Sequence, residues 1–327
     1  MRCAEQGRAP AARVILASTA ITMCAARMVA PVPRIAYFGP RGTFTEQAAR
    51  GFGSDLEPRE TIPAALEAAR TGEAELACVP VENSVEGAVP ATMDALAEGA
   101  PLIAVAETVL AVRFSLLVRP GGGPVRTVAS HPHALAQVRH WLAANLPDAV
   151  AVAATSTAAA AVAVQRGEHD AAVTAPVAAE HYPLEVAATD LADVRDAKTR
   201  FLLLRGPGAL PEPTGSDRTS VVVTAPDRVG VLSDVLVEFA LRGVNLTRIE
   251  SRPTKGPLGE YRFYIDFDGH VAEPRVGDAL AALRRHCPDT RFLGSYPKAV
   301  REDVVAENAD FVAAAEWVVA IREGRGA

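Results

Sequence analysis

Asp196-Ala197-Lys198-Thr199-Arg200-Phe201-Leu202-Leu203-Leu204 is the stretch from which the fold of this chain can be worked out. Its four apolar residues, Phe201 to Leu204, have the length of a strand, and their continuous apolar character predicts burial on both faces. Two cations and a hydroxyl, Lys198-Thr199-Arg200, precede that strand, and a Pro-, Gly- and Ser-rich segment that is typical of a domain linker follows it. Taken alone, the stretch has two interpretations: a solvated basic turn before a core strand, or the polar entrance of a ligand site.

The bulk composition narrows the class of protein. A chain of 327 residues is too long for one typical core and predicts two domains, and 49% apolar with 22% charged residues is an ordinary globular balance. The net charge of −6 and the sparse aromatic residues argue against a nucleic-acid partner. The four cysteines form no Cys-x-x-Cys pair, which is typical of a reducing compartment without structural zinc. We therefore expect a cytoplasmic protein with neither a nucleic-acid nor a membrane partner.

The first 33 residues are set aside from the fold. Three arginines precede an apolar run, Val14 to Ala26, which has about the length of a signal peptide and is too short to span a membrane. Arg27 follows at once, and Met28 is an equally good first residue. Two interpretations stay open for this leader, which we expect to be disordered or not translated: an export signal, or a start codon assigned too far upstream.

Strands alternate with helices between Arg34 and Tyr182, which predicts an α/β fold with a mainly parallel sheet. The predicted strands are 34–39, 76–81, 125–129, 150–154 and 170–174, and the predicted helices are 43–50, 61–71, 89–98, 133–145, 158–165 and 176–182. Four turns after these strands are rich in hydroxyls, amides or glycine: Gly42-Thr43, Asn83-Ser84 within a turn at 82–84, Ser130-His131 and Ser156-Thr157. Such turns lie at the carboxyl ends of strands, where ligands bind, and helix N-termini favour anions. Ordinary capping explains each turn alone, but all four with Lys198 to Arg200 predict a small ligand with more than one negative group.

Other kinds of site are disfavoured. The segment Gly39-Pro40-Arg41-Gly42 is neither a phosphate loop nor a dinucleotide fingerprint. His131 and His133 have no third ligand at metal spacing, and the chain has no Gly-x-Ser-x-Gly elbow. Glu82 and Glu86 are either a pair of acids or solvated and capping carboxylates. We therefore expect neither a metal nor a cofactor.

Four motifs, in this order along the chain, closely resemble the prephenate dehydratase family. They are Gly39-Pro40-Arg41-Gly42-Thr43-Phe44-Thr45, Val79-Pro80-Val81-Glu82-Asn83-Ser84-Val85-Glu86-Gly87, Ser130-His131-Pro132 with Gln137, and Thr199-Arg200-Phe201. The resemblance spans 34–206 and implies two lobes that are similar to those of periplasmic binding proteins, with the substrate between them. One lobe would comprise 34–108 and 191–206, and the other 109–190. His133 departs from the family, which often has Gln there.

The resemblance implies the conversion of prephenate, a dianion, into phenylpyruvate in L-phenylalanine biosynthesis, with loss of carbon dioxide and water and without a cofactor. It places the family's essential threonine at Thr199. A hydroxyl is a poor acid, so we expect Thr199 to donate a hydrogen bond to the leaving oxygen, with His131 as the alternative proton donor. Arg200 either holds a carboxylate or orients the loop. The substrate-binding residues are expected to be Gly42, Thr43, Asn83, Ser84, Ser130, His131, Gln137, Ser156, Thr157, Arg200 and Phe201.

A second module follows a linker at 207–218. Residues 219–297 have the order βαββαβ of a ferredoxin-like fold, with Tyr261 to Phe267 predicted as a half-buried strand. Gly230-Val231-Leu232 at a helix start and Glu250-Ser251-Arg252-Pro253, with Asn245 before it, resemble the ACT domain attached to prephenate dehydratases. Val229 replaces the proline that the family often has before that glycine. This resemblance implies inhibition by phenylalanine bound between paired domains. The alternative is that the two segments bind no ligand and are an ordinary turn glycine and a solvated strand end. The expected ligand residues are Gly230, Val231, Leu232, Asn245, Glu250, Ser251 and Arg252.

Several alternatives stay open. Arogenate is an alternative substrate, the oligomer is a homodimer or a homotetramer, and the effector is phenylalanine or another amino acid that inhibits or activates. A non-catalytic sensor is a different class of function. A fused chorismate mutase is not expected, because about thirty residues before Arg34 are too few for the long helical domain of that activity. Residues 298–327 form a tail whose predicted helix carries Phe311, Ala314, Ala315 and Val318 on one stripe, suited to packing on a neighbour.

Overall fold

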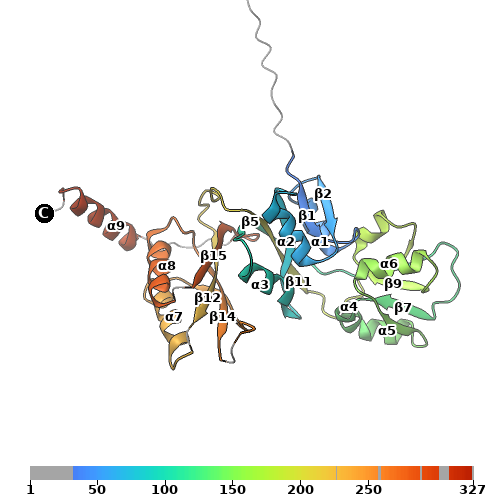
Figure 1. The fold of residues 1–327 in the computed structure, drawn as a ribbon. Coiled ribbons are helices and arrows are strands. Elements are labelled where there is room, and N and C mark those ends of the chain that lie inside the picture. Colours follow the sequence, from blue (N-terminus) through green and yellow to red (C-terminus); the bar gives the residue numbers. More distant parts are fainter. Residues whose placement is uncertain (1–31, 226, 257–258, 288, 302–308, 326–327) are drawn as a thin grey trace, which may run out of the picture. The chain divides into compact units, whose positions relative to one another are not determined.

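The computed structural model describes residues 32–225, 227–256, 259–287, 289–301 and 309–325 (Figure 1). Except for Val32 and Pro33, the predicted leader lies outside the described residues. Within the described residues the strands form three sheets, two before the linker and one after it. The chain therefore has the mixed α/β architecture that the alternation of elements predicts.

The first sheet has the order β2-β1-β3-β11-β5, with the short β4 paired to β3. Strands β2, β1 and β3 are parallel, whereas β11 runs antiparallel between β3 and β5, so the sheet is mixed and not mainly parallel. Thr43 and Thr61 cap helices α1 and α2 by accepting hydrogen bonds from Glu46 N and Ala64 N. The elements are β1 (Ile35–Phe38), α1 (Phe44–Arg50), β2 (Leu56–Arg59), α2 (Ile62–Thr71), β3 (Leu76–Asn83), β4 (Gly87–Ala88), α3 (Pro90–Ala97), β5 (Ile103–Ala111) and β11 (Lys198–Arg205). We call this part of the chain the first lobe.

Strand β11 lies in the interior of this sheet. Phe201 to Leu204 are all buried, as predicted for a strand that is covered on both faces. The strand begins at Lys198, so Thr199 and Arg200 are ladder residues opposite Asn83 and Glu82 and do not precede the strand. For the same reason the turn predicted at 82–84 is wrong for Glu82 and Asn83, which are the last residues of β3.

The second lobe is built on the sheet β10-β6-β9-β7-β8, which is parallel only in β9-β7-β8. Helix α6 packs on β9 and β7 (Figure 1). The single helix predicted at 133–145 is two helices, because the backbone leaves the helical conformation at Val138. The elements are β6 (Ser115–Val118), β7 (Thr127–Ser130), α4 (Pro132–Gln137), α5 (Arg139–Asn145), β8 (Val150–Ala153), α6 (Thr157–Gln165), β9 (Ala171–Thr174), the 3-10 helix η1 (Pro176–Glu180) and β10 (Glu185–Ala188).

The C-terminal module has the predicted βαββαβ order and an antiparallel sheet β13-β14-β12-β15. Its two helices cover one face of that sheet, where Phe239 packs on Phe267 in the module's own core. Strand β14 was predicted to be half-buried, but Tyr264 and Asp266 on its other face are buried too. The elements are β12 (Asp217–Ala225), α7 (Val231–Ala240), β13 (Leu246–Pro253), β14 (Tyr261–Asp268), α8 (Pro274–His286) and β15 (Thr290–Pro297).

The second face of β14 is buried because the module's sheet packs against the first lobe. Tyr264 and Tyr296 share one hydrophobic core with Met93 and Ala104 of the first lobe. Gly294 of β15 has φ +133°, and a Cβ on it would stand 2.3 Å from the carbonyl oxygen of Ala104. A side chain at this position would therefore separate β15 from β5, and only glycine fits.

Helix α9 (Ala309–Arg322) lies in the predicted tail and carries no buried residue. Part of the tail, 302–308, lies outside the described residues. No helix within the described ranges combines the length and the apolar character needed to cross a membrane.

Candidate active site

A cavity of about 520 Å³ is lined by residues of both lobes. The first lobe contributes Thr43 at the start of α1, Asn83 at the end of β3 and Thr199 at the start of β11. The second lobe contributes the turns that precede α4 and α6. The predicted turns therefore lie around one cavity, because the carboxyl ends of parallel strands meet at the same edge of each sheet.

Most of the residues predicted to bind substrate line this cavity, and four do not. Ser130 is fully buried and donates a hydrogen bond to the carbonyl of Val173, at 2.6 Å. Ser84 accepts a hydrogen bond from Lys198 N at 2.9 Å and lines a different hollow, together with Arg200. The predicted residues that line the cavity are Thr43, Asn83, His131, Gln137, Ser156, Thr157, Thr199 and Phe201; those that do not are Gly42, Ser84, Ser130 and Arg200.

Asn83 fixes the hydroxyl of Thr199. The Asn83 side-chain oxygen accepts hydrogen bonds from Val85 N at 2.8 Å and Glu86 N at 3.0 Å, so the amide nitrogen must point the other way. That nitrogen donates to Thr199 Oγ1 at 2.9 Å. Because Oγ1 accepts this bond, its own hydrogen remains available to a molecule in the cavity.

His131 is the other candidate proton donor. Its Nδ1 accepts a hydrogen bond from His133 N at 3.3 Å, and the two rings meet edge to face with their centroids 4.9 Å apart. Burial and the neighbouring His133 lower the pKa of His131, against the opposing effect of Glu86. The imidazolium form of His131 is therefore less populated at neutral pH than that of an ordinary histidine, which disfavours it as the proton donor there.

Gly42 joins the two lobes beside the cavity. It has φ +88°, and a Cβ on it would stand 3.0 Å from the Tyr182 ring and 3.1 Å from Ala178 of the second lobe. Its N–H donates to the buried carboxylate of Glu46 at 2.5 Å, and Glu46 also contacts His181 of the second lobe at 2.8 Å. Glycine is thus required here by lobe–lobe packing.

The cavity is polar at its strand ends and apolar elsewhere. Phe44 and Phe114 meet edge to face in its wall, with ring centroids 5.6 Å apart, and the first lobe also contributes Phe38. No Lys or Arg stands among the described residues that line it. Sequence reasoning missed this apolar wall, because its members come from distant segments and carry no local signal. It also left four polar lining residues out of the predicted set: Thr45, Glu86, His133 and Thr155.

Arg200 lies on the opposite face of the first-lobe sheet from the cavity. Its guanidinium forms ion pairs with Glu82, Glu107 and Asp266. Burial lowers the pKa of Arg200, but Asp266, Tyr296 and Glu107 outweigh burial and raise the pKa well above its ordinary value. The cationic entrance predicted from Lys198 and Arg200 therefore faces away from the cavity.

The predicted ligand residues of the C-terminal module fall into two segments. Gly230 to Leu232 form the start of α7, and Glu250 to Arg252 lie on the edge strand β13. Burial alternates along β13, so Ser251 is exposed while Glu250 and Arg252 lie on the face toward the first lobe. Asn245 donates a hydrogen bond to Asp268 at 2.9 Å.

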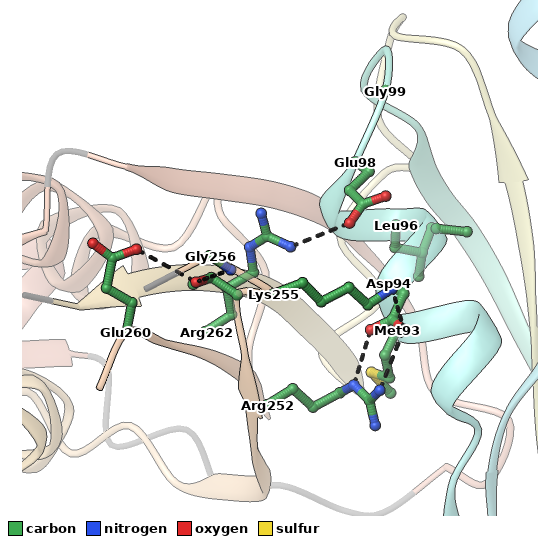
Figure 2. Close-up of polar contacts among 12 residues, drawn as sticks. Met93, Asp94, Leu96, Glu98, Gly99, Arg252, Lys255, Gly256, Glu260 and Arg262 are labelled. Carbon is green, nitrogen blue, oxygen red and sulfur yellow. Dashed lines mark hydrogen bonds and ion pairs between the residues drawn. The ribbon is translucent and has the colours of Figure 1, made fainter. Parts of the chain in front are cut away.

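Arg252 connects β13 to helix α3 of the first lobe. Its Nε and Nη2 donate to the two oxygens of Asp94 at 3.0 and 3.3 Å, and Lys255 Nζ adds a contact to Asp94 at 2.9 Å (Figure 2). Burial alone would raise the pKa of Asp94, but Lys255 and Arg252 lower it, so this carboxylate stays ionised. Helix α3 begins at Pro90, which lines the cavity. One helix therefore touches both the predicted effector motif and the cavity.

Comparison with known proteins connects this geometry to a family. Residues 35–208 match the family model of prephenate dehydratase, and residues 219–285 match that of the ACT domain. A prephenate dehydratase of Amycolatopsis methanolica is 65% identical over 302 residues, which cover 90% of this chain and 99% of that protein.

Two solved structures extend the comparison. The first is prephenate dehydratase of Arthrobacter aurescens in complex with L-Phe, at 46% identity and a TM-score of 0.81, with 89% of this chain and 99% of the other covered. The second is GqqA, described as a novel type of quorum quenching acylase, at 32% identity and a TM-score of 0.73, with 81% and 97% covered.

Proposed function

The chain belongs to the prephenate dehydratase family, and on that premise we propose which of its residues carry the family's reaction. The reaction converts prephenate to phenylpyruvate: the ring carboxylate leaves as carbon dioxide, its electron pair enters the ring, and the ring hydroxyl departs and takes up a proton to form water. The new aromatic ring supplies the driving force. The protein must therefore hold the two carboxylates and assist the departing oxygen.

Thr199 assists the departing oxygen in this proposal. The observation that supports it is the bond from Asn83 Nδ2 to Thr199 Oγ1, which leaves the hydroxyl hydrogen available to the cavity. A preorganised donor of this kind is worth roughly 10²–10³ in rate. The lowered pKa of His131 argues against an imidazolium as the main proton donor. The final proton then comes from solvent at or after departure of the hydroxide.

The two carboxylates of prephenate would be held by amides and hydroxyls, since the described lining residues include no Lys or Arg. The N-termini of α1, α4 and α6 meet at the cavity, and the partial positive charge of a helix N-terminus favours an anion. Ser156 and Thr157 lie at the start of α6, and Gln137 extends the polar wall. The apolar wall around Phe44 and Phe114 suits the ring.

The test is a turnover assay with purified full-length protein and prephenate. We expect phenylpyruvate to form, and Thr199→Ala to fold normally and to lose at least a hundredfold in kcat. Near-wild-type turnover of Thr199→Ala would refute the assignment. Absence of phenylpyruvate with the unaltered protein would favour a non-catalytic sensor, and arogenate at the same concentration would measure substrate preference.

The C-terminal module is proposed to bind phenylalanine and inhibit the reaction. The support is the ACT-domain match and the Arthrobacter relative, whose structure contains L-Phe. Ser251→Trp should relieve inhibition without changing basal turnover, because Ser251 is exposed and does not line the cavity. Unchanged turnover at saturating phenylalanine would contradict this regulation.

We also propose that the protein is a homo-oligomer of at least two chains and that it works in the cytoplasm. Strand β13 is a sheet edge whose unpaired backbone groups and exposed Ile249 suit pairing with a second copy. Cys78 and Cys287 are free and buried, as suits a reducing compartment. Sedimentation analysis with and without phenylalanine would distinguish a dimer from a tetramer, and a monomer under both conditions would refute a site shared between chains.

A further inference from the structure

Strands β3 and β11 pair so that two residue pairs stand back to back. Thr199 is opposite Asn83, and Arg200 is opposite Glu82. Successive side chains of a strand point to opposite faces, so the Asn83–Thr199 pair lines the cavity while the Glu82–Arg200 pair lies on the back face. The distance between Asn83 and Thr199 therefore depends on the same register that the back-face pair fixes.

This end of the two strands is separated from their regular ladder. The register shifts between Arg200 and Phe201, since Arg200 is opposite Glu82 and Phe201 is opposite Pro80. A bulge of this kind bends a strand and weakens the constraint from the neighbouring ladder. Ser84 and Lys198 hold the outermost position by two hydrogen bonds of 2.9 Å, and β5 holds the other edge of β11 in unbroken register from Lys198 to Leu203. Between β3 and β11, the ion pair of Arg200 with Glu82 is the side-chain contact at the bulge.

Arg200 is itself held from three strands. Its Nη1 donates a hydrogen bond to Glu107 Oε2 of β5 at 3.2 Å, and its Nη2 donates one to Asp266 of β14. Its Nε lies 3.2 Å from Glu82 Oε2 of β3, which is an ion pair without hydrogen-bond geometry. The arginine side chain is only 8% exposed. Arg218 and Arg248 fix Glu107 and Asp266 in turn, at 2.6 and 3.1 Å. These partners hold the guanidinium of Arg200 in one position, and this also helps to hold β11, the strand that carries it.

We propose that Arg200 is a positioning residue for the reaction: from the back face it fixes the ends of β3 and β11, so that Asn83 and Thr199 meet at hydrogen-bond distance in the cavity. Asp266, which holds Arg200, belongs to the C-terminal module, so that module takes part in setting the geometry of the reacting hydroxyl. This role rests on the proposed function of Thr199. Of the two roles expected for Arg200, this proposal develops the orienting role and not the binding of a substrate carboxylate.

The test uses Arg200→Gln, Glu82→Gln and the control Arg242→Gln in the full chain. Arg242 is also a half-buried arginine paired with two carboxylates, Glu238 and Asp278, but all three belong to the helical side of the C-terminal module and not to the Arg200 cluster. We expect Arg200→Gln to lower kcat by about 10- to 100-fold, since a misplacement of 1 Å can cost about 10². KM should change less than about twofold, because other elements carry the turns that face the substrate. Arg242→Gln should keep kcat within about threefold of the wild type, since it leaves Arg200 and its partners in place.

A double-mutant cycle separates positioning from general structural damage. If Arg200 acts through Thr199, Arg200→Gln should change the residual kcat of Thr199→Ala by less than about twofold. Equal losses in both backgrounds would refute the positioning role alone. Full activity of Thr199→Ala would refute the proposed function as well.

Glu82→Gln keeps the test decisive if Arg200→Gln does not fold. The Glu82 side chain is 38% exposed, and Glu107 and Asp266 still compensate the charge of Arg200 when the charge of Glu82 is removed. We expect its kcat to fall by about 3- to 10-fold, a smaller loss because Glu107 and Asp266 still hold Arg200. The loss should again vanish in the Thr199→Ala background, and a wild-type kcat for Glu82→Gln would overturn the proposal.

Discussion

Asn83→Asp should reverse the hydrogen bond on which the proposed reaction depends. The aspartate keeps an oxygen for Val85 N and Glu86 N, so the turn keeps both of its bonds. Its second oxygen replaces the amide nitrogen 2.9 Å from Thr199 Oγ1. A carboxylate oxygen only accepts, so the hydroxyl must now donate to it and not to the leaving oxygen. Asn83→Asp should therefore abolish the contribution of the Thr199 donor while both residues stay in place.

The magnitude follows from what such a donor contributes. Loss of one preorganised donor costs about 10²–10³ in kcat, or about 2.7–4 kcal/mol of transition-state stabilisation. KM should rise separately, because a new negative charge lines a cavity that is proposed to hold a dianion. Initial rates of phenylpyruvate formation over a range of prephenate concentrations separate the two effects.

Two controls decide the interpretation of Asn83→Asp. Asn145→Asp adds the same charge at an exposed amide on α5, whose side chain donates a hydrogen bond to the carbonyl of Trp141, and should leave kcat unchanged. In the Thr199→Ala background, Asn83→Asp should lower kcat no further, although KM still rises. A kcat for Asn83→Asp within about threefold of the wild type would refute Thr199 as a hydrogen-bond donor.

Three further predictions test other parts of the structure. Burial and His133 lower the pKa of His131 from its ordinary 6.5, so this ring is mainly neutral above that pH, and kcat should be flat from pH 6.5 to about 8. A steady rise of kcat as the pH falls through this range would favour His131 as the acid. Gly294→Ala should lower the free energy of unfolding by about 1–3 kcal/mol, because its Cβ would meet the carbonyl oxygen of Ala104. The control Gly123→Ala, whose Cβ would meet nothing within 4 Å, should leave the melting temperature unchanged. If both variants melt at the wild-type temperature, β15 and β5 are not in contact. Asp94→Asn should keep basal turnover and raise the phenylalanine concentration for half-inhibition up to about fivefold, which corresponds to about 1 kcal/mol for a partly exposed ion pair. The control is Asp55→Asn, at the exposed pair with Arg34, and an unchanged response of Asp94→Asn to phenylalanine would exclude the Arg252–Asp94 pair as a link.

Local patterns were enough where the determinant of structure is itself local. The apolar run from Phe201 to Leu204 predicted a buried strand, and the alternation of elements predicted the α/β fold and the βαββαβ module. Thr43 and Ser156 lie in turns for which ordinary capping was one prediction, and both cap their helices, because an N-cap bonds within its own first turn. The family resemblance was confirmed by matches that cover most of the chain.

Predictions failed where the outcome depends on partners far along the chain. Lys198 to Arg200 were predicted to precede a strand, but pairing with β3 and β5 extends β11 through all three. The second face of β14 is buried by the first lobe, which nothing in the alternation of Tyr261 to Phe267 reveals. The strands β2, β5, β6 and β10 were not predicted, because sheet pairing, and not local periodicity, defines them.

The sequence by itself determined that Thr199 and Arg200 are neighbours at the entrance of a core strand, with four anion-suited turns before them and a regulatory-type module after them. Only the tertiary structure decided that these two neighbours serve opposite faces of one sheet: Thr199 in the cavity with Asn83, and Arg200 behind it with Glu82 and Asp266. The physical reason is the two-residue period of a strand. Which face a side chain takes depends on the register with the paired strands, and register is set by contacts between distant parts of the chain.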